Sequence, residues 1–202
     1  MARYTGPKHH LCKAEGIALC GSVKCPVIRK NAGLPGQHGS KRRRKQSEYG
    51  MQLREKQKVK RMYGVLERQF QKYYTIASRA KKATGEVLLQ ILETRLDNVI
   101  FRLKLAKSRA QARQLVSHGH VLVDNKVVTI PSFNVKLGSV ISLSAQAANL
   151  DFIKKLIEET KNEILPSWLS KKVTVGKISK VPKREDITEE IDERLIVEYY
   201  SR

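Results

Sequence analysis

All three cysteines of this chain lie within residues 9–25, together with two of its five histidines. A disulfide, a metal site and a chance grouping are the three interpretations. A lasting disulfide is rare inside cells, and three thiols leave one unpaired. Zinc prefers four sulfur or nitrogen ligands in a tetrahedron, and three cysteines with one histidine are a common structural set. The pattern therefore favours a metal site.

The ligand set of such a site follows from the spacing. Cys12, Cys20 and Cys25 would supply three thiolates. His9 precedes Cys12 with two residues between them, which is the usual spacing of a zinc knuckle, whereas His10 leaves only one. We therefore predict one structural Zn²⁺ per chain, held by His9, Cys12, Cys20 and Cys25. All four positions would be filled by protein, so no catalytic water is expected there.

The net charge of +21 restricts the class of partner. Residues 1–45 contain 11 basic residues and 1 acidic residue, whereas residues 151–202 contain 11 of each. An excess this large repels itself unless a polyanion neutralises it, and nucleic acid is the usual partner. An anionic membrane and a merely soluble basic surface are weaker interpretations.

No apolar run approaches the roughly 18 residues of a membrane span, and no signal-peptide segment follows the start. We expect an intracellular, cytoplasmic protein.

The sequence predicts an irregular, basic N-terminal segment followed by several helices. GLPGQHG at 33–39 indicates tight turns, and the basic run 41–45 follows it. Helical spacing begins at Ser47, continues through 66–77, and predicts one or two buried helices over 85–103. SRAQARQLVSHGH at 108–120 predicts a helix that Ser108 caps and that Gly119 ends.

The period then changes from helical to alternating. VLVDNKVV places Asp124–Asn125 between two β-branched runs, which predicts a hairpin. A further strand region follows Pro131 with Gly138 in a turn, residues 151–164 return to helical spacing, and the tail around 191–200 suggests a strand. These elements predict an α+β fold. We expect Trp168 to be a core residue.

Several long motifs occur together in order: PGQHG (35–39), YGMQLREKQKVKRMYGVLERQFQKYY (49–74), TRLDNVIFRL (94–103) and ARQLVSHGHVLV (112–123). With them the chain resembles the bacterial-type ribosomal protein family uS4 over essentially its whole length. The resemblance implies a non-enzymatic, primary binder of small-subunit ribosomal RNA. Such a protein grips a multi-helix junction of the 5′ domain, nucleates assembly, and lies near the messenger RNA entry beside small-subunit protein five, where it supports translational accuracy. Messenger RNA is a further partner, and no membrane is implied.

The resemblance also implies a division of the chain. Residues 1–46 would be an irregular, zinc-stabilised extension and 47–92 a mainly helical body. Residues 93–155 would be an inserted S4-type RNA-binding module of two helices and a hairpin region, and 156–202 would pack back on the helical body. Some family members have four cysteines here and others none. His9 stands where the first cysteine would be, so a relic site without metal is the alternative.

A-form RNA is met mainly through phosphates, 2′-hydroxyls and shape, so its binding requires many cations on rigid supports. For each basic residue of a helix the alternative is an ordinary solvated face. His118 and His120 beside the helix end have a backbone-bonding role as their alternative. The candidate RNA-binding residues are Lys41, Arg42, Arg43, Arg44, Lys45, Arg54, Lys56, Lys58, Lys60, Arg61, Arg95, Arg109, Arg113, Gln114, His118 and His120.

Two other functions remain as alternatives. An RNA-modifying enzyme could use the same small module, but the chain shows no Gly-rich nucleotide loop or nucleophile triad outside it. A DNA-binding regulator is the second, and would bind duplex DNA as well as folded RNA.

Overall fold

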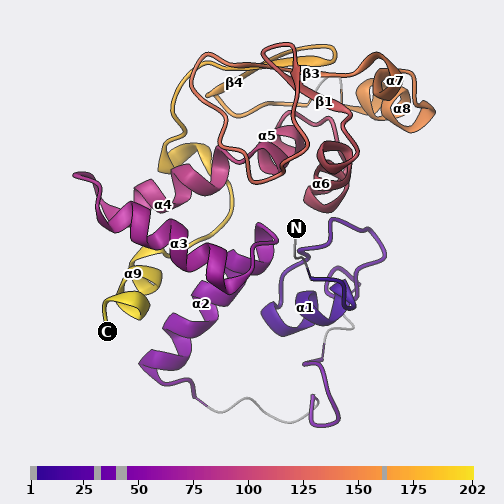
Figure 1. Cartoon of the computed structure of the whole chain (residues 1–202). Coiled ribbons are helices and arrows are strands. Elements are labelled where there is room, and N and C mark those ends of the chain that lie inside the picture. Colours follow the sequence, from indigo (N-terminus) through magenta and orange to yellow (C-terminus); the bar gives the residue numbers. More distant parts are fainter. Residues whose placement is uncertain (1–3, 30–32, 40–44, 161–162) are drawn as a thin grey trace. The chain divides into compact units, whose positions relative to one another are not determined.

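The computed structural model of the chain describes residues 4–29, 33–39, 45–160 and 163–202 (Figure 1). It is a mixed structure of helices and one small antiparallel sheet, as the α+β prediction requires. The described chain divides into two compact units. We call Met1–Gly85 with Glu190–Arg202 the N-terminal unit, and Glu86–Glu189 the central unit. None of the described helices is long and apolar enough to cross a bilayer.

The N-terminal unit is helical. The hydroxyl of Ser47 caps its longest helix by accepting a hydrogen bond from the Gly50 amide at 3.2 Å, and Gly64 follows that helix with a positive φ of 62°. Val59 and Phe70 are fully buried in its core. The helices are α1 (Lys8–Glu15), α2 (Glu48–Met62), α3 (Glu67–Ser78) and α9 (Glu193–Ser201).

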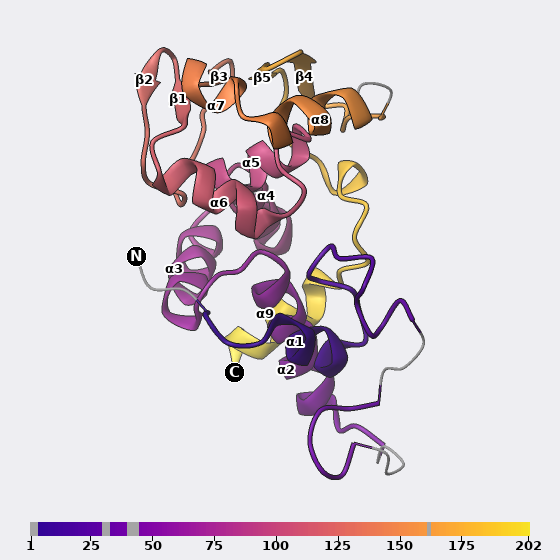
Figure 2. The same cartoon turned by 90° about the vertical axis from the view of Figure 1, so that its right-hand side faces the viewer.

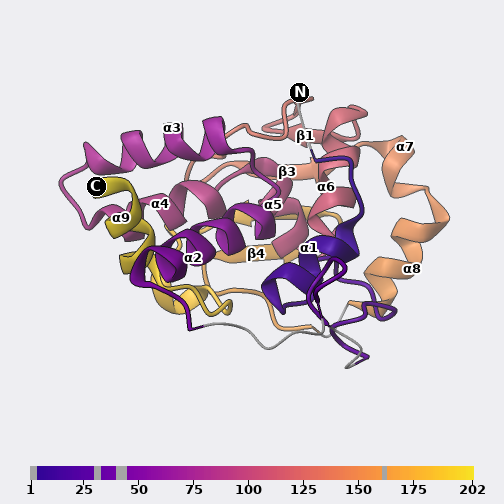
Figure 3. The same cartoon turned by 90° about the horizontal axis from the view of Figure 1, so that it is seen from below.

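The prediction of a strand at the C-terminus is wrong, because this segment forms the helix α9. Asp192 caps the helix by accepting from the Arg194 amide at 3.0 Å. Ile196 and Tyr200, one turn apart, face the other helices: Ile196 is fully buried, and the Tyr200 ring stacks on Tyr74 at 4.6 Å. Figure 3 shows α9 alongside α2, its main contact. The β-branched residues Ile196 and Val197 favour a strand locally. As a helix, however, the segment can pack its apolar face on α2, and this packing decides the structure.

The central unit contains an antiparallel sheet of order β2-β1-β3-β5-β4 (Figure 2). The predicted hairpin is β1 and β2, and both of its turn residues have positive φ, 49° at Asp124 and 63° at Asn125. This is the geometry that suits a two-residue hairpin turn. Gly138 also has the positive φ, 84°, expected of its turn. The strands are β1 (Val121–Val123), β2 (Lys126–Val127), β3 (Val140–Leu143), β4 (Leu169–Lys172) and β5 (Val175–Ile178).

Helices pack on this sheet to form the core of the central unit. A Cβ on Gly176 of β5 would lie 2.4 Å from the Leu103 side chain, so the glycine allows the close approach of the segment after α5 to the sheet. Trp168 is 1% exposed and belongs to this core, as predicted. The helices of this core are α5 (Leu96–Arg102), α6 (Arg109–Ser117), α7 (Ala145–Ala148) and α8 (Asp151–Glu159). The central unit also contains most of α4 (Thr84–Glu93), which begins at the boundary between the units, and a 3₁₀ turn at Arg184–Asp186.

The segment 156–202 contributes to both units. Its strands β4 and β5 extend the sheet, with Ile141 of β3 opposite Gly176 of β5. Its last helix, α9, packs instead on α2 of the N-terminal unit. The predicted boundaries at 93 and 155 therefore do not coincide with the spatial division at residues 85 and 189.

Candidate functional site

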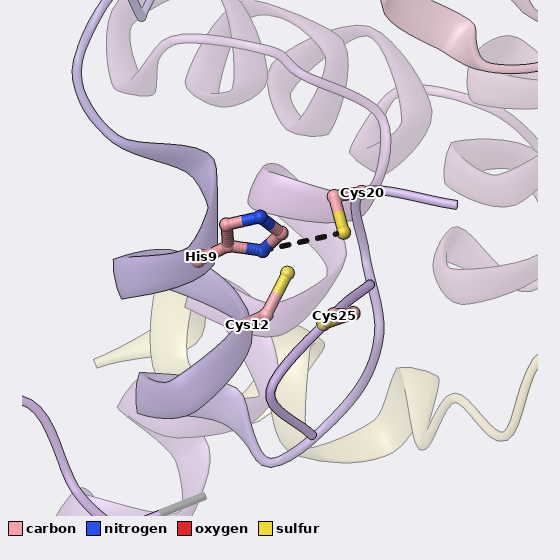
Figure 4. A group of neighbouring side chains, drawn as sticks. All are labelled: His9, Cys12, Cys20 and Cys25. Atoms are coloured by element: carbon pink, nitrogen blue, oxygen red, sulfur yellow. Dashed lines mark hydrogen bonds between the residues drawn. The ribbon is translucent and has the colours of Figure 1, made fainter. Parts of the chain in front are cut away.

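The four residues predicted as metal ligands lie together (Figure 4). The sulfur and imidazole nitrogen atoms of His9, Cys12, Cys20 and Cys25 are all within 4.8 Å of one another. The Nδ1 atom of His9 lies 3.7 Å from the Cys20 sulfur. His10, the alternative ligand, is not part of this group. All three cysteines are free thiols in the structure.

Local backbone structure explains how residues 9–25 form the cluster. His9 and Cys12 lie on the same face of α1, one turn apart. Gly16 ends this helix in the left-handed conformation, with φ 74°, and turns the chain back. The Cys25 amide donates to the Ser22 carbonyl at 3.0 Å in a tight turn that returns the third thiol. Cys12 and Cys25 are fully buried.

The thiols differ in how readily they ionise. Burial raises the pKa of the Cys12 thiol to about 11. Burial of Cys25 also opposes ionisation, but hydrogen bonds from the Val27 backbone, from His9 and from the other thiols lower its pKa to about 7. Metal binding requires thiolates, so a cation here would displace protons.

The donor set fits a tetrahedral ion. With Zn–S bonds of about 2.3 Å, the edges of a tetrahedral site measure about 3.8 Å. An edge between a sulfur and a nitrogen is about 3.6 Å, because Zn–N bonds are shorter, and the His9–Cys20 distance of 3.7 Å is close to this value. No two ligand atoms are more than 4.8 Å apart, so the group needs to contract by at most about 1 Å. Three sulfurs and one nitrogen are ligands that zinc prefers to calcium or magnesium. These residues are therefore compatible with zinc.

The basic residues predicted on α2 have carboxylate partners. The Lys58 ammonium pairs with Glu55 on the same helix at 2.9 Å, and the Lys60 ammonium with Glu67 of α3 at 2.8 Å. Arg61 donates to the carboxylate of Glu15. These three basic side chains keep 15–28% of their surface exposed. Helix α2 therefore carries several positive charges, which nearby carboxylates partly neutralise.

Lys56 on the same helix is buried. It is 3% exposed, its ammonium lies 2.7 Å from Glu67, and it sits over the Tyr199 ring at 4.6 Å from the ring centroid. The Tyr200 hydroxyl donates to the same Glu67 carboxylate at 2.7 Å. Burial alone would raise the pKa of Glu67, but these partners and Lys60 lower it to about 2. The charge of Lys56 thus serves the packing of α2 with α3 and α9.

Arg95, at the start of α5, is also internal. It is 2% exposed, and its Nε and Nη2 atoms donate to the two oxygens of Asp97 at 3.1 and 3.0 Å. A planar fork of this kind is the strongest geometry for an arginine–carboxylate pair.

Arg109, the first residue of α6, is 17% exposed. Its Nε donates to Asn98 and its Nη2 to Glu189, both at 2.8 Å, while its guanidinium lies 4.6 Å from the centre of the Phe101 ring. Asn98 and Arg102 in turn share the Glu93 carboxylate. Arg109 is therefore a cation whose position is fixed by Asn98, Glu189 and Phe101.

The remaining candidates of this region lie in α6 and in the segment that follows it. Gln114 and His118 are exposed, whereas Arg113 and His120 are half-buried. The helix ends as predicted: the His118 amide donates to the Gln114 carbonyl at 3.0 Å, and Gly119 has φ 74°. The His120 carbonyl accepts from the Ser144 amide at 2.9 Å. This contact uses the backbone alone, so the imidazole of His120 stays a candidate RNA contact. Lys45 is exposed, and residues 41–44 lie outside the described chain.

Comparison with known proteins identifies the family. A model described as "Ribosomal protein S4/S9 N-terminal domain" matches residues 3–93, and one described as "S4 domain" matches 94–141. A protein of Thermoanaerobacter sp. (strain X514), named "Small ribosomal subunit protein uS4", is 52% identical over 210 aligned residues that cover 100% of both chains. One of the same name from Herpetosiphon aurantiacus is 53% identical over 214 aligned residues, also covering 100% of both. This chain belongs to the uS4 family.

The two family matches meet at residues 93 and 94, close to the end of α4. The cysteine cluster and the cationic helix α2 lie in the first match, and Arg95, Arg109 and α6 lie in the second. uS4 is a family of structural proteins of the ribosome rather than of enzymes.

Sequence reasoning missed the carboxylates that engage this chain's basic residues. Of these pairs only Lys58–Glu55, three residues apart on one helix, has a local signal. Glu15, Glu67 and Glu189 reach cations 7 to 87 residues away along the chain. Their roles depend on tertiary packing, for which the sequence carries no spacing signal.

Proposed function

We propose that this uS4-family protein is a structural component of the small ribosomal subunit that binds ribosomal RNA. The observation that carries the proposal is the match of the whole chain to relatives named small ribosomal subunit protein uS4, at about half identity. The net charge of +21 supports a polyanionic partner.

The finer role comes from the family resemblance. The protein would bind a multi-helix junction in the 5′ domain of the small-subunit RNA and nucleate assembly there. It would lie near the messenger RNA entry, beside small-subunit protein five, and support accurate translation. Rigid helices with cations on one face suit this task, because A-form RNA presents phosphates and 2′-hydroxyls rather than readable base edges.

Burial narrows the proposed RNA interface. Lys56 and Arg95 are internal and are left out of it. The partly exposed cations of α2 remain, with the candidates of α6 and of the segment that follows it: Arg54, Lys58, Lys60, Arg61, Arg109, Arg113, Gln114, His118 and His120. The basic run 41–45 precedes α2 and would add positive charge to the same function.

The cysteine cluster would hold one structural Zn²⁺ through His9, Cys12, Cys20 and Cys25. The support is the compact S₃N donor set and the burial of two of its thiols. Residues 4–29 contain just one short helix, α1, and the buried residues among them are Cys12 and Cys25. Apart from these two ligands the segment therefore has almost no core of its own. A bound zinc contributes folding free energy directly, and apparent values reach about 10–16 kcal/mol in small zinc domains.

RNA binding by the purified full chain tests the proposal. We expect much tighter binding to a transcript of the small-subunit 5′ domain than to a DNA duplex of equal length. Arg113→Ala should weaken binding to the transcript about tenfold, the effect of losing one charge-assisted phosphate contact. Arg194→Ala is the matched control, because Arg194 is exposed in the electrically neutral C-terminal quarter.

Two results would contradict the proposal. One is equal affinity for the DNA duplex and the RNA transcript at the same salt concentration. The other is failure of the full chain to co-sediment with the small ribosomal subunit. Elemental analysis of the same preparation, purified without chelator, should give about one zinc per chain.

A further inference from the structure

A buried carboxylate joins the metal-ligand helix to the cationic helix. The Glu15 side chain is 1% exposed, at the last position of α1. Its Oε1 accepts a hydrogen bond from Arg61. Its Oε2 lies 3.7 Å from the Arg54 Nη1 atom and, within the described structure, has no hydrogen-bond partner. Glu15 thus lies between two arginines that belong to the candidate RNA interface.

The backbone of α1 makes a second contact with the same arginine pair. The Arg54 Nη1 atom donates to the Ala14 carbonyl at 2.7 Å. The last carbonyls of a helix are unsatisfied within it and bear partial negative charge, so a cation is favourable there. The C-terminal end of α1 is therefore fixed to α2 by a carbonyl and a carboxylate together. Removing either arginine would leave the buried acid with one counter-charge instead of two, which is costly.

The same helix, α1, also contributes two residues to the metal cluster. His9, Cys12 and Glu15 follow one another at intervals of three residues along α1. The helix has 8 residues, and helices this short are marginal without tertiary support. The described contacts that support α1 are those of its thiol–imidazole face and those of its C-terminal end with α2. Fixing the ligands at one end therefore orders the carboxylate at the other.

We propose that Glu15 is a positioning residue that couples metal occupancy of the cluster to the geometry of Arg54 and Arg61. With metal bound, α1 is ordered and holds both guanidinium groups in place. Their side chains stay 41% and 28% exposed, so each presents an ordered edge to an RNA phosphate. Without metal, α1 loosens and the two arginines lose that orientation. Ordered cations bind with a smaller entropy cost, so metal and RNA bind cooperatively. This inference rests on the proposed metal site and RNA binding.

Zinc affinity of the full chain, measured by competition with a chromogenic chelator, tests the coupling without RNA. Glu15→Gln keeps the shape of the side chain and removes its charge. We expect about tenfold weaker zinc binding, typical for a residue that orients a metal site from outside it. Arg61→Gln should weaken binding at least as much, because the buried Glu15 charge then keeps only Arg54, 3.7 Å away, as its counter-charge. The double variant should be no weaker than the worse single one, since both changes remove one interaction.

The matched control is Arg68→Gln, which makes the same charge change at an exposed position of α3. We expect its zinc affinity to stay within twofold of wild type. Wild-type affinity in Glu15→Gln, or single effects that multiply in the double variant, would overturn the coupling and leave the metal site itself intact. Absence of zinc from the wild-type chain would overturn the metal site and the coupling together.

Binding to the 5′-domain transcript tests the second half of the coupling. Removing zinc from the wild-type chain should weaken this binding about tenfold. In zinc-saturated Glu15→Gln, where no carboxylate on α1 holds the two arginines, removing zinc should change this affinity less than threefold. The same loss of affinity in both proteins would show that the metal acts on RNA binding by a route other than Glu15.

Discussion

The carboxylate of Glu189 lies between Arg102, which donates to it at 2.6 Å, and Arg109, which donates at 2.8 Å. Its burial opposes ionisation, but the two arginines lower its pKa to about 2. Arg102 also contacts the fully buried Glu93. The charges of this group are therefore interdependent. One of its two acids, Glu189, is the last residue of the central unit.

Replacing Glu189 should destabilise the central unit. Glu189→Gln would leave Arg102 and Arg109 without a shared counter-charge, and we expect a loss of about 2 kcal/mol in the free energy of unfolding. Urea denaturation measures it as a lower transition midpoint. Glu190→Gln is the control, because its side chain is exposed and makes no contact that the structure describes. Equal midpoints for the two variants would contradict the structural role of Glu189.

Elements of the N-terminal unit meet at a single acidic side chain. Glu67 begins α3, accepts from Lys56 and Lys60 of α2, and accepts from the Tyr200 hydroxyl of α9. Burial and the Glu67 charge raise the pKa of Tyr200 above its usual value, so its hydroxyl remains a donor. The aromatic Tyr200, in the segment predicted as a strand, thus lies on the packing face of a helix.

This junction makes part of the stability acid-sensitive. The pKa of Glu67 is about 2 in the folded chain, below the ordinary value of 4.5. Its contribution is therefore fully present above pH 4.5 and is lost as the pH falls from 4.5 towards 2. Glu67→Gln should remove this part of the pH dependence, measured as the urea midpoint at several pH values. Tyr200→Phe, which keeps the ring, should retain most of it. Parallel pH profiles for wild type and Glu67→Gln would contradict this assignment.

At the scale of the whole molecule, the excess positive charge lies in residues 1–150, and residues 151–202 are neutral. Some acids of the neutral part pair with cations of the basic part, as Glu189 does with Arg109 and Glu163 with Lys104. The charge still uncompensated is what RNA would neutralise, with release of its counterions.

The dependence of RNA affinity on salt should therefore report how many phosphates the protein neutralises. Replacing the run 41–45 by five glutamines keeps its length and removes its charge. The slope of log affinity against log salt should become shallower by about 0.7–0.9 for each phosphate that the variant no longer neutralises. Replacing Lys177 and Lys180 of the neutral quarter by glutamine is the control. An unchanged slope for the 41–45 variant would show that this run does not bind RNA.

Local patterns were sufficient for much of the fold. The cap at Ser108, the end at Gly119 and the hairpin at Asp124–Asn125 depend on backbone chemistry within a few residues, and the structure confirms them. The four-residue metal cluster was also predictable, because its ligands lie within 17 consecutive residues. The C-terminal helix was not, since its choice between strand and helix depends on α2, far away in the chain.

The sequence alone determined the cationic character of this protein, its family and its cysteine–histidine cluster, because composition and local spacing carry those properties. Only the tertiary structure decided which cations face solvent. Lys56 and Arg95 look like surface residues by type and are buried, while Glu15 and Glu67 become the partners of arginines and lysines. The physical reason is that an ion pair depends on distance in space, and packing brings together charges that sequence separation does not relate.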